Sequence, residues 1–301
     1  MTTRTAQAMT RPLTVNPALL HLRGKYMRFY FAESPPDQAE VTIVGMPLDR
    51  TSSFIPGTRF GPSMMRIGAD NIESFSPYQR RDVTDCRIHD AGELTFTYPD
   101  PRAPLDLVRQ TTRASYAADR RQLALGGEHT ITPAIVSVLA NIHPDLCVIQ
   151  FDAHSDLRDE YLSEKWCHAT AMSRVLDAVG RDRLFQLGIR SFSSGTEMES
   201  AGMYPFEVLA PIGEVKTAIG GRPVYVTLDL DVLDPSVLPD VQTPQPGGCD
   251  YRELVRALSA LSDLNLVGAD VVEFCPRNSQ PSPGATVAAE LVREFCLLLS
   301  H

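Results

Sequence analysis

Several features that would assign this chain to other protein classes are missing from its 301 residues. No apolar run approaches the roughly 18 residues that a membrane-spanning helix requires, so we expect no membrane partner. No Gly-x-Gly-x-x-Gly follows a predicted strand and there is no Walker loop, so nucleotide binding has no support. No linker or internal repeat divides the sequence, which predicts one main domain.

Paired cysteines are also missing. The six cysteines are scattered and form no Cys-x-x-Cys motif. This pattern argues against a disulfide framework and against a zinc ribbon, and it is typical of reduced thiols. We therefore expect a cytoplasmic protein.

Basic residues are scarce relative to acidic ones. The chain has 28 Lys and Arg against 37 Asp and Glu, which gives a net charge of −9. Binding to phosphate backbones needs clustered Lys and Arg, so nucleic acid is not expected as a partner. An acidic protein favours small cationic ligands, although mild acidity also serves solubility alone.

The first 32 residues contain five basic residues and no acid before Glu33. An organelle transit peptide would have this composition. However, Tyr26, Phe29, Tyr30 and Phe31 form an aromatic cluster that is better suited to docking on a surface, at a subunit contact or the rim of an active site. We interpret residues 1–38 as an N-terminal arm that precedes one domain over 39–301.

Predicted strands alternate with predicted helices along that domain. We expect strands at 41–45, 122–125, 146–150, 184–188, 224–228 and 266–272. We expect helices at 64–69, 104–119, 133–141, 168–176, 250–261 and 286–299. Residues 87–94 are polar with little periodicity and receive no element. The alternation predicts an α/β fold with a mainly parallel sheet.

Asp152, His154 and Asp156 follow the predicted 146–150 strand at alternate positions. Along extended backbone, alternate side chains point to one side, so we expect these three to converge. Two carboxylates so close would repel each other unless a cation lay between them. A lone Asp-x-His-x-Asp could equally be a polar loop facing solvent.

Polar residues at other strand ends decide between these readings. His129 follows the 122–125 strand, Asp229 and Asp231 follow the 224–228 strand, and Glu273 follows the 266–272 strand. Ligands bind outside the carboxyl ends of parallel strands, so these residues should share one pole of the sheet. Two histidines and four aspartates suit a pair of divalent ions, with Mn²⁺ the best compromise between oxygen and imidazole ligands. Such a pair activates a shared water.

Four motifs resemble those of the ureohydrolase (arginase/agmatinase) family, and the similarity runs from about residue 41 to the C-terminus. They are Gly-Gly-Glu-His at 126–129, Asp-Ala-His-Ser-Asp at 152–156, Cys-His-Ala at 167–169 and Asp-Leu-Asp-Val-Leu-Asp-Pro at 229–235. Residues 57–62 and 271–273 also match. The segment 156–170 resembles the agmatinase branch more than the arginases.

The resemblance implies a single-domain, three-layer α/β/α sandwich that holds two Mn²⁺ ions and assembles as a trimer or hexamer. One ion would be bound by His129, Asp152, Asp156 and Asp229. The other would be bound by His154, Asp152, Asp229 and Asp231, with Asp152 and Asp229 bridging.

The resemblance also implies roles for residues that do not bind metal. His168 would relay protons, Glu273 would bind the substrate guanidinium, and a ligand aspartate, Asp231, would protonate the leaving amine. The alternative for His168 is a surface histidine at the start of a helix, and the alternative for Glu273 is a solvated carboxylate at a strand end. Cys167 beside His168 could suggest a Cys/His nucleophile, but adjacent side chains point apart.

The departures from the family pattern are modest. Glu128 stands where many members have Asp, and Cys167 stands where the agmatinase pattern has Ser. The run after Glu273 also lacks the common tail of the family.

The expected reaction is hydrolysis of agmatine to urea and putrescine, as in polyamine biosynthesis. Acidic residues near the active-site rim should attract the amine end of agmatine and repel guanidino acids, and Asp159 is the first choice for that contact. Asp159 could instead pair with Arg158 or Lys165. Guanidinobutyrate, guanidinopropionate and arginine remain alternative substrates, and a non-catalytic metal-binding paralogue is a rival of another class.

Overall fold

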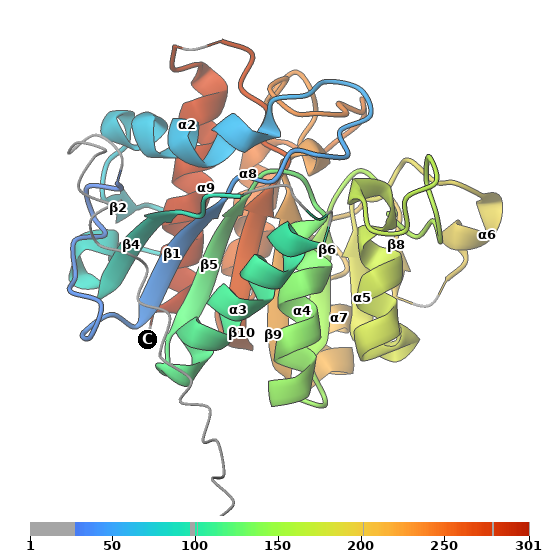
Figure 1. Ribbon diagram of the computed structural model, residues 1–301, viewed down its shortest axis with the longest axis horizontal. Helices are drawn as coiled ribbons and strands as arrows, with labels where there is room; N and C mark the ends of the chain where they lie inside the picture. The colour runs from blue at the N-terminus through green and yellow to red at the C-terminus, as the bar shows by residue number, and fades with distance from the viewer. Residues whose placement is uncertain (1–27, 97–99, 101, 201, 279, 301) are drawn as a thin grey trace, which may run out of the picture.

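The central feature is an eight-stranded sheet in which all neighbouring strands pair in parallel (Figure 1). The computed structural model describes residues 28–96, 100, 102–200, 202–278 and 280–300. In spatial order the strands are β4 (Ile88–Glu93), β1 (Val41–Met46), β5 (Arg121–Gly126), β10 (Asn265–Val272), β9 (Pro223–Asp229), β6 (Cys147–Phe151), β7 (Leu184–Leu187) and β8 (Met203–Tyr204). The predicted parallel α/β fold is confirmed.

Helices cover both faces of this sheet (Figure 1). One layer contains α3 (Ala103–Ala117), α4 (Ile131–Ile142) and α5 (Ala171–Val179). The other contains α2 (Gly61–Gly68), α7 (Ile212–Ile219), α8 (Tyr251–Ser259) and α9 (Pro283–Leu299). Each layer shares a separate apolar core with one face of the sheet, which gives the expected three-layer sandwich.

Shorter elements connect these layers. They are a two-stranded antiparallel pair, β2 (Phe75–Ser76) and β3 (Arg81–Asp82), the helix α6 (Gly195–Met198), and single 3₁₀ turns at Thr58–Phe60, Ala69–Asn71, Val83–Asp85, His168–Thr170, Arg181–Arg183 and Leu230–Val232.

The strand and helix boundaries follow from local sequence. Central strands such as β9 are apolar and buried on both faces because a helical layer lies on each side. The Asp250 side chain caps α8 by accepting from the Glu253 backbone N–H at 2.7 Å, as the sequence predicts. Ser282 caps α9 in the same way, accepting from the Ala285 N–H.

The sheet edge β4 lies in residues 87–94, for which the sequence predicts no element. This polar segment can form a strand because its carboxylate, Asp90, is fully buried and is paired with the buried Arg66 guanidinium. Arg66, on α2, donates to both oxygens of Asp90 at 2.8 Å and to Glu93 at 3.0 Å. A bidentate partner from another element makes a charged strand residue tolerable, and a single sequence does not reveal that partner.

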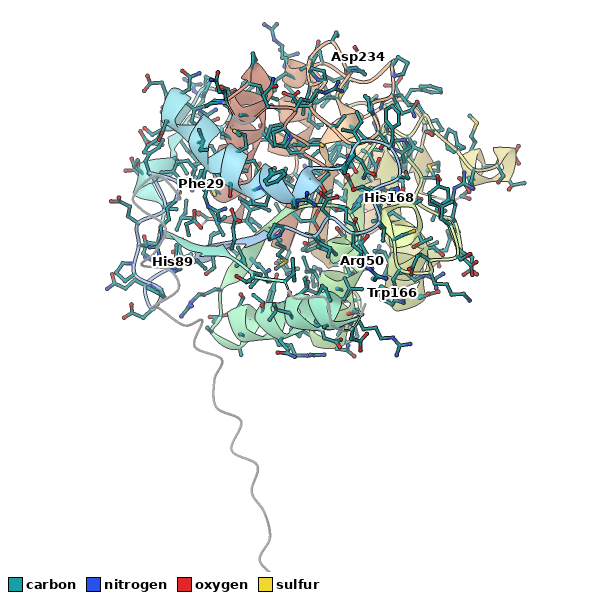
Figure 2. The ribbon with its side chains drawn as sticks, turned by 45° about the horizontal axis from the view of Figure 1, so that its top comes forward. Phe29, Arg50, His89, Trp166, His168 and Asp234 are labelled. Atoms are coloured by element: carbon teal, nitrogen blue, oxygen red, sulfur yellow. The ribbon has the colours of Figure 1, made fainter. Side chains whose placement is uncertain are left out.

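The end of the N-terminal arm packs along β4. The Phe29 N–H donates to Asp90, Glu33 forms a β-bridge with His89, and the Phe29 and Phe31 side chains are buried. Figure 2 shows Phe29 and His89 at the same edge of the molecule. These contacts cover an otherwise open sheet edge. Tyr26 and the basic residues from Arg4 to Lys25, on which the transit-peptide reading depends, lie outside the described residues.

The strand order creates one position where ligands are expected. After β5 the chain crosses to β6, and β9 and β10 return later to fill the gap between them. The carboxyl ends of these four central strands therefore border a topological switch point. Among the described helices, none is long and apolar enough to cross a membrane.

Candidate metal centre

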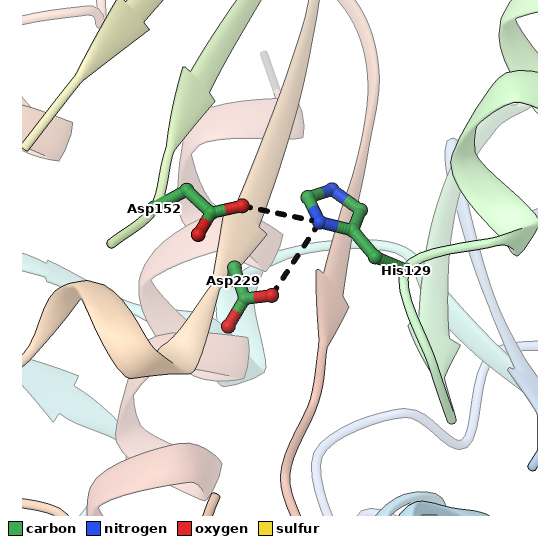
Figure 3. Close-up of side chains that lie close together, drawn as sticks. All are labelled: His129, Asp152 and Asp229. Carbon is green, nitrogen blue, oxygen red and sulfur yellow. Dashed lines mark ion pairs between the residues drawn. The ribbon is translucent and has the colours of Figure 1, made fainter. Parts of the chain in front are cut away.

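His129 faces three carboxylates at the end of β5. Its Nδ1 atom lies 3.2 Å from an Asp152 oxygen, 3.1 Å from an Asp156 oxygen and 3.4 Å from an Asp229 oxygen. Figure 3 shows His129 with Asp152 and Asp229. One ring nitrogen carries at most one hydrogen, so it cannot satisfy three carboxylates by donation. A cation among these four side chains would satisfy all of them.

His154 forms a second group beside the first. Its Nδ1 lies 2.9 Å from Asp231 Oδ2 and 3.6 Å from Asp152 Oδ1. Asp152 belongs to both groups, since its Oδ2 faces His129 and its Oδ1 faces His154. Asp152 could therefore contact a cation held by either group. Asp229 joins the His129 group, and its Oδ1 also accepts from the Asp231 N–H at 2.9 Å.

The convergence of residues 152–156 is as expected, but its structural cause differs from the predicted one. Strand β6 ends at Phe151, so the alternation of an extended strand does not continue. The loop is instead held by two backbone N–H donors: Ala153 donates to Asp231 and His154 donates to Asp152. Asp156 then has a left-handed φ of 51°. Such strain in a non-glycine residue is concentrated at functional sites.

A buried hydroxyl fixes the ring of His129. Its Nε2 lies 2.9 Å from the Thr227 hydroxyl, which donates to Asp270 at 2.6 Å. Because the only hydrogen of Thr227 goes to the carboxylate, His129 must donate from Nε2. In the neutral ring, Nδ1 is then the nitrogen without a hydrogen and the one that can bind a metal ion. Metal-binding histidines commonly donate a hydrogen bond from their other ring nitrogen in this way.

Glu273 lies beside the cluster at the end of β10. Its Oε1 accepts from the His129 backbone N–H and its Oε2 accepts from the Gln242 amide, each at 2.7 Å. Burial, together with the nearby Glu128 carboxylate, raises the pKa of Glu273 to about 8. Its φ of 65° is a second left-handed non-glycine conformation at the site.

One pocket joins the cluster to the remaining predicted residues. Glu273 and His168 both line it, together with three of the six predicted metal ligands. The lining residues are Ser53, His154, Asp156, Arg158, Tyr161, His168, Ala169, Asp229, Thr243 and Glu273. Burial lowers the pKa of the His168 imidazole to about 4. The His168 side chain is buried in the pocket wall, so it is not the solvent-facing histidine of the alternative reading.

Asp159 is the one predicted site residue that lies neither in the aspartate–histidine cluster nor in the lining of the pocket. Its side chain is 76% exposed and its carboxylate pairs with Arg174 at 2.7 Å and with Lys165 at 3.9 Å. Another acid near the rim, Glu164, pairs with Arg50 at 3.1 Å. The predicted attraction of an ammonium group to free rim acids therefore has no support at these two residues.

Several residues that orient the site lie outside the motifs recognised in the sequence. Thr51, Ser53, Gln242, Thr227 and Asp270 all contact a predicted site residue or its partner. Thr51 and Ser53 precede the family-like segment 57–62, and that position was the available signal. Gln242 and Asp270 carry no spacing that distinguishes them from ordinary polar residues.

The proton affinity of the cluster explains how the protein should respond to metal removal. Burial and repulsion from neighbouring aspartates raise the pKa of Asp156 to about 6 and that of Asp229 well above its usual range. Burial alone would lower the pKa values of His129 and His154. The carboxylates that face them outweigh this effect and raise both pKa values well above the usual range. The metal-free folded state thus holds protons that the unfolded chain releases at lower pH.

We therefore expect the metal-free protein to lose stability as the pH rises from about 5 to about 8. Groups with raised folded-state pKa values stabilise the fold below their unfolded pKa values, and this contribution is lost as they deprotonate. Metal binding releases the same protons, so the stabilisation by metal should grow over this pH range. Melting temperatures with a divalent ion and after chelation, at pH 5.5 and pH 8, measure this gap. A smaller difference in melting temperature at pH 8 than at pH 5.5 would contradict the assignment of these residues as metal ligands.

Comparisons with known proteins identify the family. The Arginase family sequence model matches residues 39–298. An agmatinase from Bacillus cereus is 37% identical over 276 residues, which cover 89% of this chain and 95% of the relative. The crystal structure of agmatine ureohydrolase from Thermoplasma volcanium has a TM-score of 0.80 at 28% identity and covers 93% of this chain and 97% of that one.

Proclavaminate amidino hydrolase from Streptomyces clavuligerus superimposes with a TM-score of 0.83 at 26% identity, over 92% of this chain and 97% of that chain. These matches confirm the resemblance seen in the motifs and the fold expected from it. The chain belongs to the Arginase family and is a metal-dependent ureohydrolase.

Proposed function

We propose that this enzyme hydrolyses agmatine to urea and putrescine with two Mn²⁺ ions, which would supply polyamine biosynthesis. The observation that supports it most is the common pocket of Glu273, His168 and the aspartate–histidine cluster. A guanidinium resists attack by water because it is resonance-stabilised. Hydrolysis therefore requires a carboxylate for the cation, an activated water and a proton donor at one place.

The proposed ligands are those predicted from the motifs. His129, Asp152, Asp156 and Asp229 would hold one ion, and His154, Asp152, Asp229 and Asp231 the other. When bound, such ions would supply Lewis-acid activation of the attacking water. Two imidazole nitrogens and four carboxylates match the ligand preference of Mn²⁺ better than that of Zn²⁺ or Ca²⁺.

Glu273 would bind the guanidinium. Each of its oxygens accepts one hydrogen bond from the protein, from the His129 N–H or from Gln242. Each oxygen thus keeps a lone pair for a substrate N–H, which permits a bidentate, charge-assisted contact. Because the carboxylate is buried, an arriving cation would also compensate the cost of ionising it.

Asp231 and His168 would move the protons. The Asp231 carboxylate contacts His154 and accepts from Thr243 Oγ1 at 3.2 Å, on the same side of the cluster as the pocket. It would carry a proton from the attacking water to the leaving amine. His168, on the pocket wall, would exchange protons with solvent.

The lining of the pocket supports agmatine. Asp156 and Asp229 are assigned to metal, so Glu273 is the lining carboxylate that remains for a substrate cation, and it suits the guanidinium end of agmatine. The agmatinase relatives support the same substrate. Free rim acids are not part of this argument, because Asp159 and Glu164 are paired.

One observation favours a second candidate, a guanidino acid such as guanidinobutyrate. Arg158 lines the pocket with its guanidinium 5.4 Å from the centre of the Tyr161 ring, where it could pair with a substrate carboxylate. Against this, Arg158 lies close enough to the Glu197 carboxylate to help lower its pKa, so part of its charge is offset within the protein.

Urea release from agmatine, guanidinobutyrate and arginine separates the candidates. We expect kcat/KM for agmatine to exceed the other two by about tenfold or more, the effect of roughly one charged contact. A guanidinobutyrate value equal to or above that for agmatine would refute the proposal. Arg158→Gln is the matched variant: it should abolish turnover of guanidinobutyrate only if Arg158 binds the carboxylate.

We further propose that residues 39–301 are the catalytic domain, that the chain forms a trimer or hexamer, and that it acts in the cytoplasm. The extent of the family match supports the first of these. Sedimentation velocity measures the second.

A further inference from the structure

We propose that Glu128 and Thr51 act as positioning residues that fix which ring nitrogen of His168 carries the hydrogen before proton transfer. This inference rests on the role proposed for His168. It concerns a buried acid that binds no metal in the arrangement above and stands where many relatives have the shorter Asp.

Glu128 reaches across to the loop that follows β1. The side chain is fully buried, and each of its two oxygens accepts two hydrogen bonds. Oε2 accepts from the backbone N–H groups of Arg50 at 2.9 Å and Thr51 at 2.6 Å. Oε1 accepts from the hydroxyls of Thr51 at 2.9 Å and Thr130 at 2.8 Å. Burial raises the pKa of the Glu128 carboxyl, but all four contacts are hydrogen-bond donors, so both oxygens serve as acceptors here.

The Thr51 hydroxyl connects Glu128 to His168. It has one hydrogen and two lone pairs. The hydrogen is directed to Glu128, and one lone pair accepts from the His168 backbone N–H at 3.2 Å. The ring Nδ1 of His168 lies 3.2 Å from the same oxygen. Since the hydroxyl has no hydrogen left to donate, Nδ1 must carry one and donate it to Thr51.

His168 Nε2 is then unprotonated. It lies 3.1 Å from the Ser53 hydroxyl, and both residues line the pocket. A shuttle needs this state, because a bare Nε2 can take a proton from the pocket and return it while Nδ1 keeps its own. The Glu128 carboxylate would also stabilise the positive charge that forms on the ring, transmitted through one hydroxyl.

The first test removes the Thr51 hydroxyl without changing the shape of the side chain. In the full-length, metal-loaded enzyme, Thr51→Val should lower kcat by roughly tenfold, within the effect of general acid–base assistance, with KM nearly unchanged. Thr51→Ser should restore kcat. Ser52→Ala, which removes the neighbouring hydroxyl that donates to Asp49, is the matched control and should keep wild-type kcat.

A double-mutant cycle tests whether Thr51 acts through His168. His168→Ala alone should lower kcat by roughly 10- to 10³-fold while bound metal and melting temperature stay near wild type. Thr51→Val should then cause no further loss in the His168→Ala background, because the interaction is already absent. An equal loss in both backgrounds would overturn the proposal and assign Thr51 a purely structural role.

Glu128→Gln tests the direction of the hydrogen bonds. The replacement amide would donate to Thr51, which would free the threonine hydrogen for Nδ1 and move the ring hydrogen to Nε2. We expect a fall in kcat at least as large as that of Thr51→Val, with unchanged metal content. Unchanged kcat would contradict the inference. All variants are compared on whichever guanidino substrate the wild type hydrolyses, so failure of the agmatine assignment would leave this test intact.

Discussion

Asp152→Asn should bind at most one tightly held ion per chain and lose roughly 10³-fold or more of its urea-releasing activity, since loss of metal catalysis costs several kcal/mol. Asp152 contacts both halves of the cluster, with Oδ2 toward His129 and Oδ1 toward His154. An amide has the same shape, but it has no charge and only one acceptor oxygen, so it cannot bridge two cations.

Elemental analysis and a urea assay on the same preparation measure both effects. Asp177→Asn is the matched control, because Asp177 is an exposed carboxylate on α5 that pairs with Arg174 outside the pocket. It should keep wild-type metal content and activity. An Asp152→Asn protein that still binds two ions and remains fully active would show that Asp152 does not bridge.

Glu273→Gln should lower kcat/KM by about 10²-fold, mainly by raising KM, because a charge-assisted hydrogen bond contributes up to about 3 kcal/mol. The variant loses the charge that faces the guanidinium, and its amide must point donors at either the His129 N–H or the Gln242 amide, which are donors themselves. Metal content should not change, since no predicted ligand is removed.

Inhibition by free guanidinium provides a readout that does not depend on turnover chemistry. The ion should compete with substrate in the wild-type enzyme and lose most of its effect in Glu273→Gln. If the variant instead loses bound metal along with activity, Glu273 is a ligand and the guanidinium must be bound elsewhere.

The main features of the site could be predicted from the sequence because each lies in a short motif at the end of a strand. His129 and Asp229 directly follow apolar runs, and parallel strands bring their carboxyl ends together whatever the details of the loops. For residues 152–156 the convergence was right although the chain leaves the strand at Asp152. Backbone N–H donors from the loop, rather than strand alternation, hold those side chains.

The features that were not predicted depend on pairs distant in sequence. Strand β4 requires Arg66 to neutralise Asp90. Asp159 does pair with Lys165, as one of the alternatives predicted, but its nearer partner is Arg174, on a helix that the local charge pattern did not connect to it. Glu128 similarly acquires its proposed role only through Thr51, 77 residues earlier in the chain. A single sequence gives the residue types in such pairs but not which of them meet.

Titration of the metal-free enzyme with Mn²⁺, with urea release from agmatine measured at each step, tests the central claim most directly. The two groups around His129 and His154 predict that two ions bind per chain and that full activity appears only as the second site fills. Full activity with one tightly bound ion per chain, or no urea at any metal content, would contradict the account.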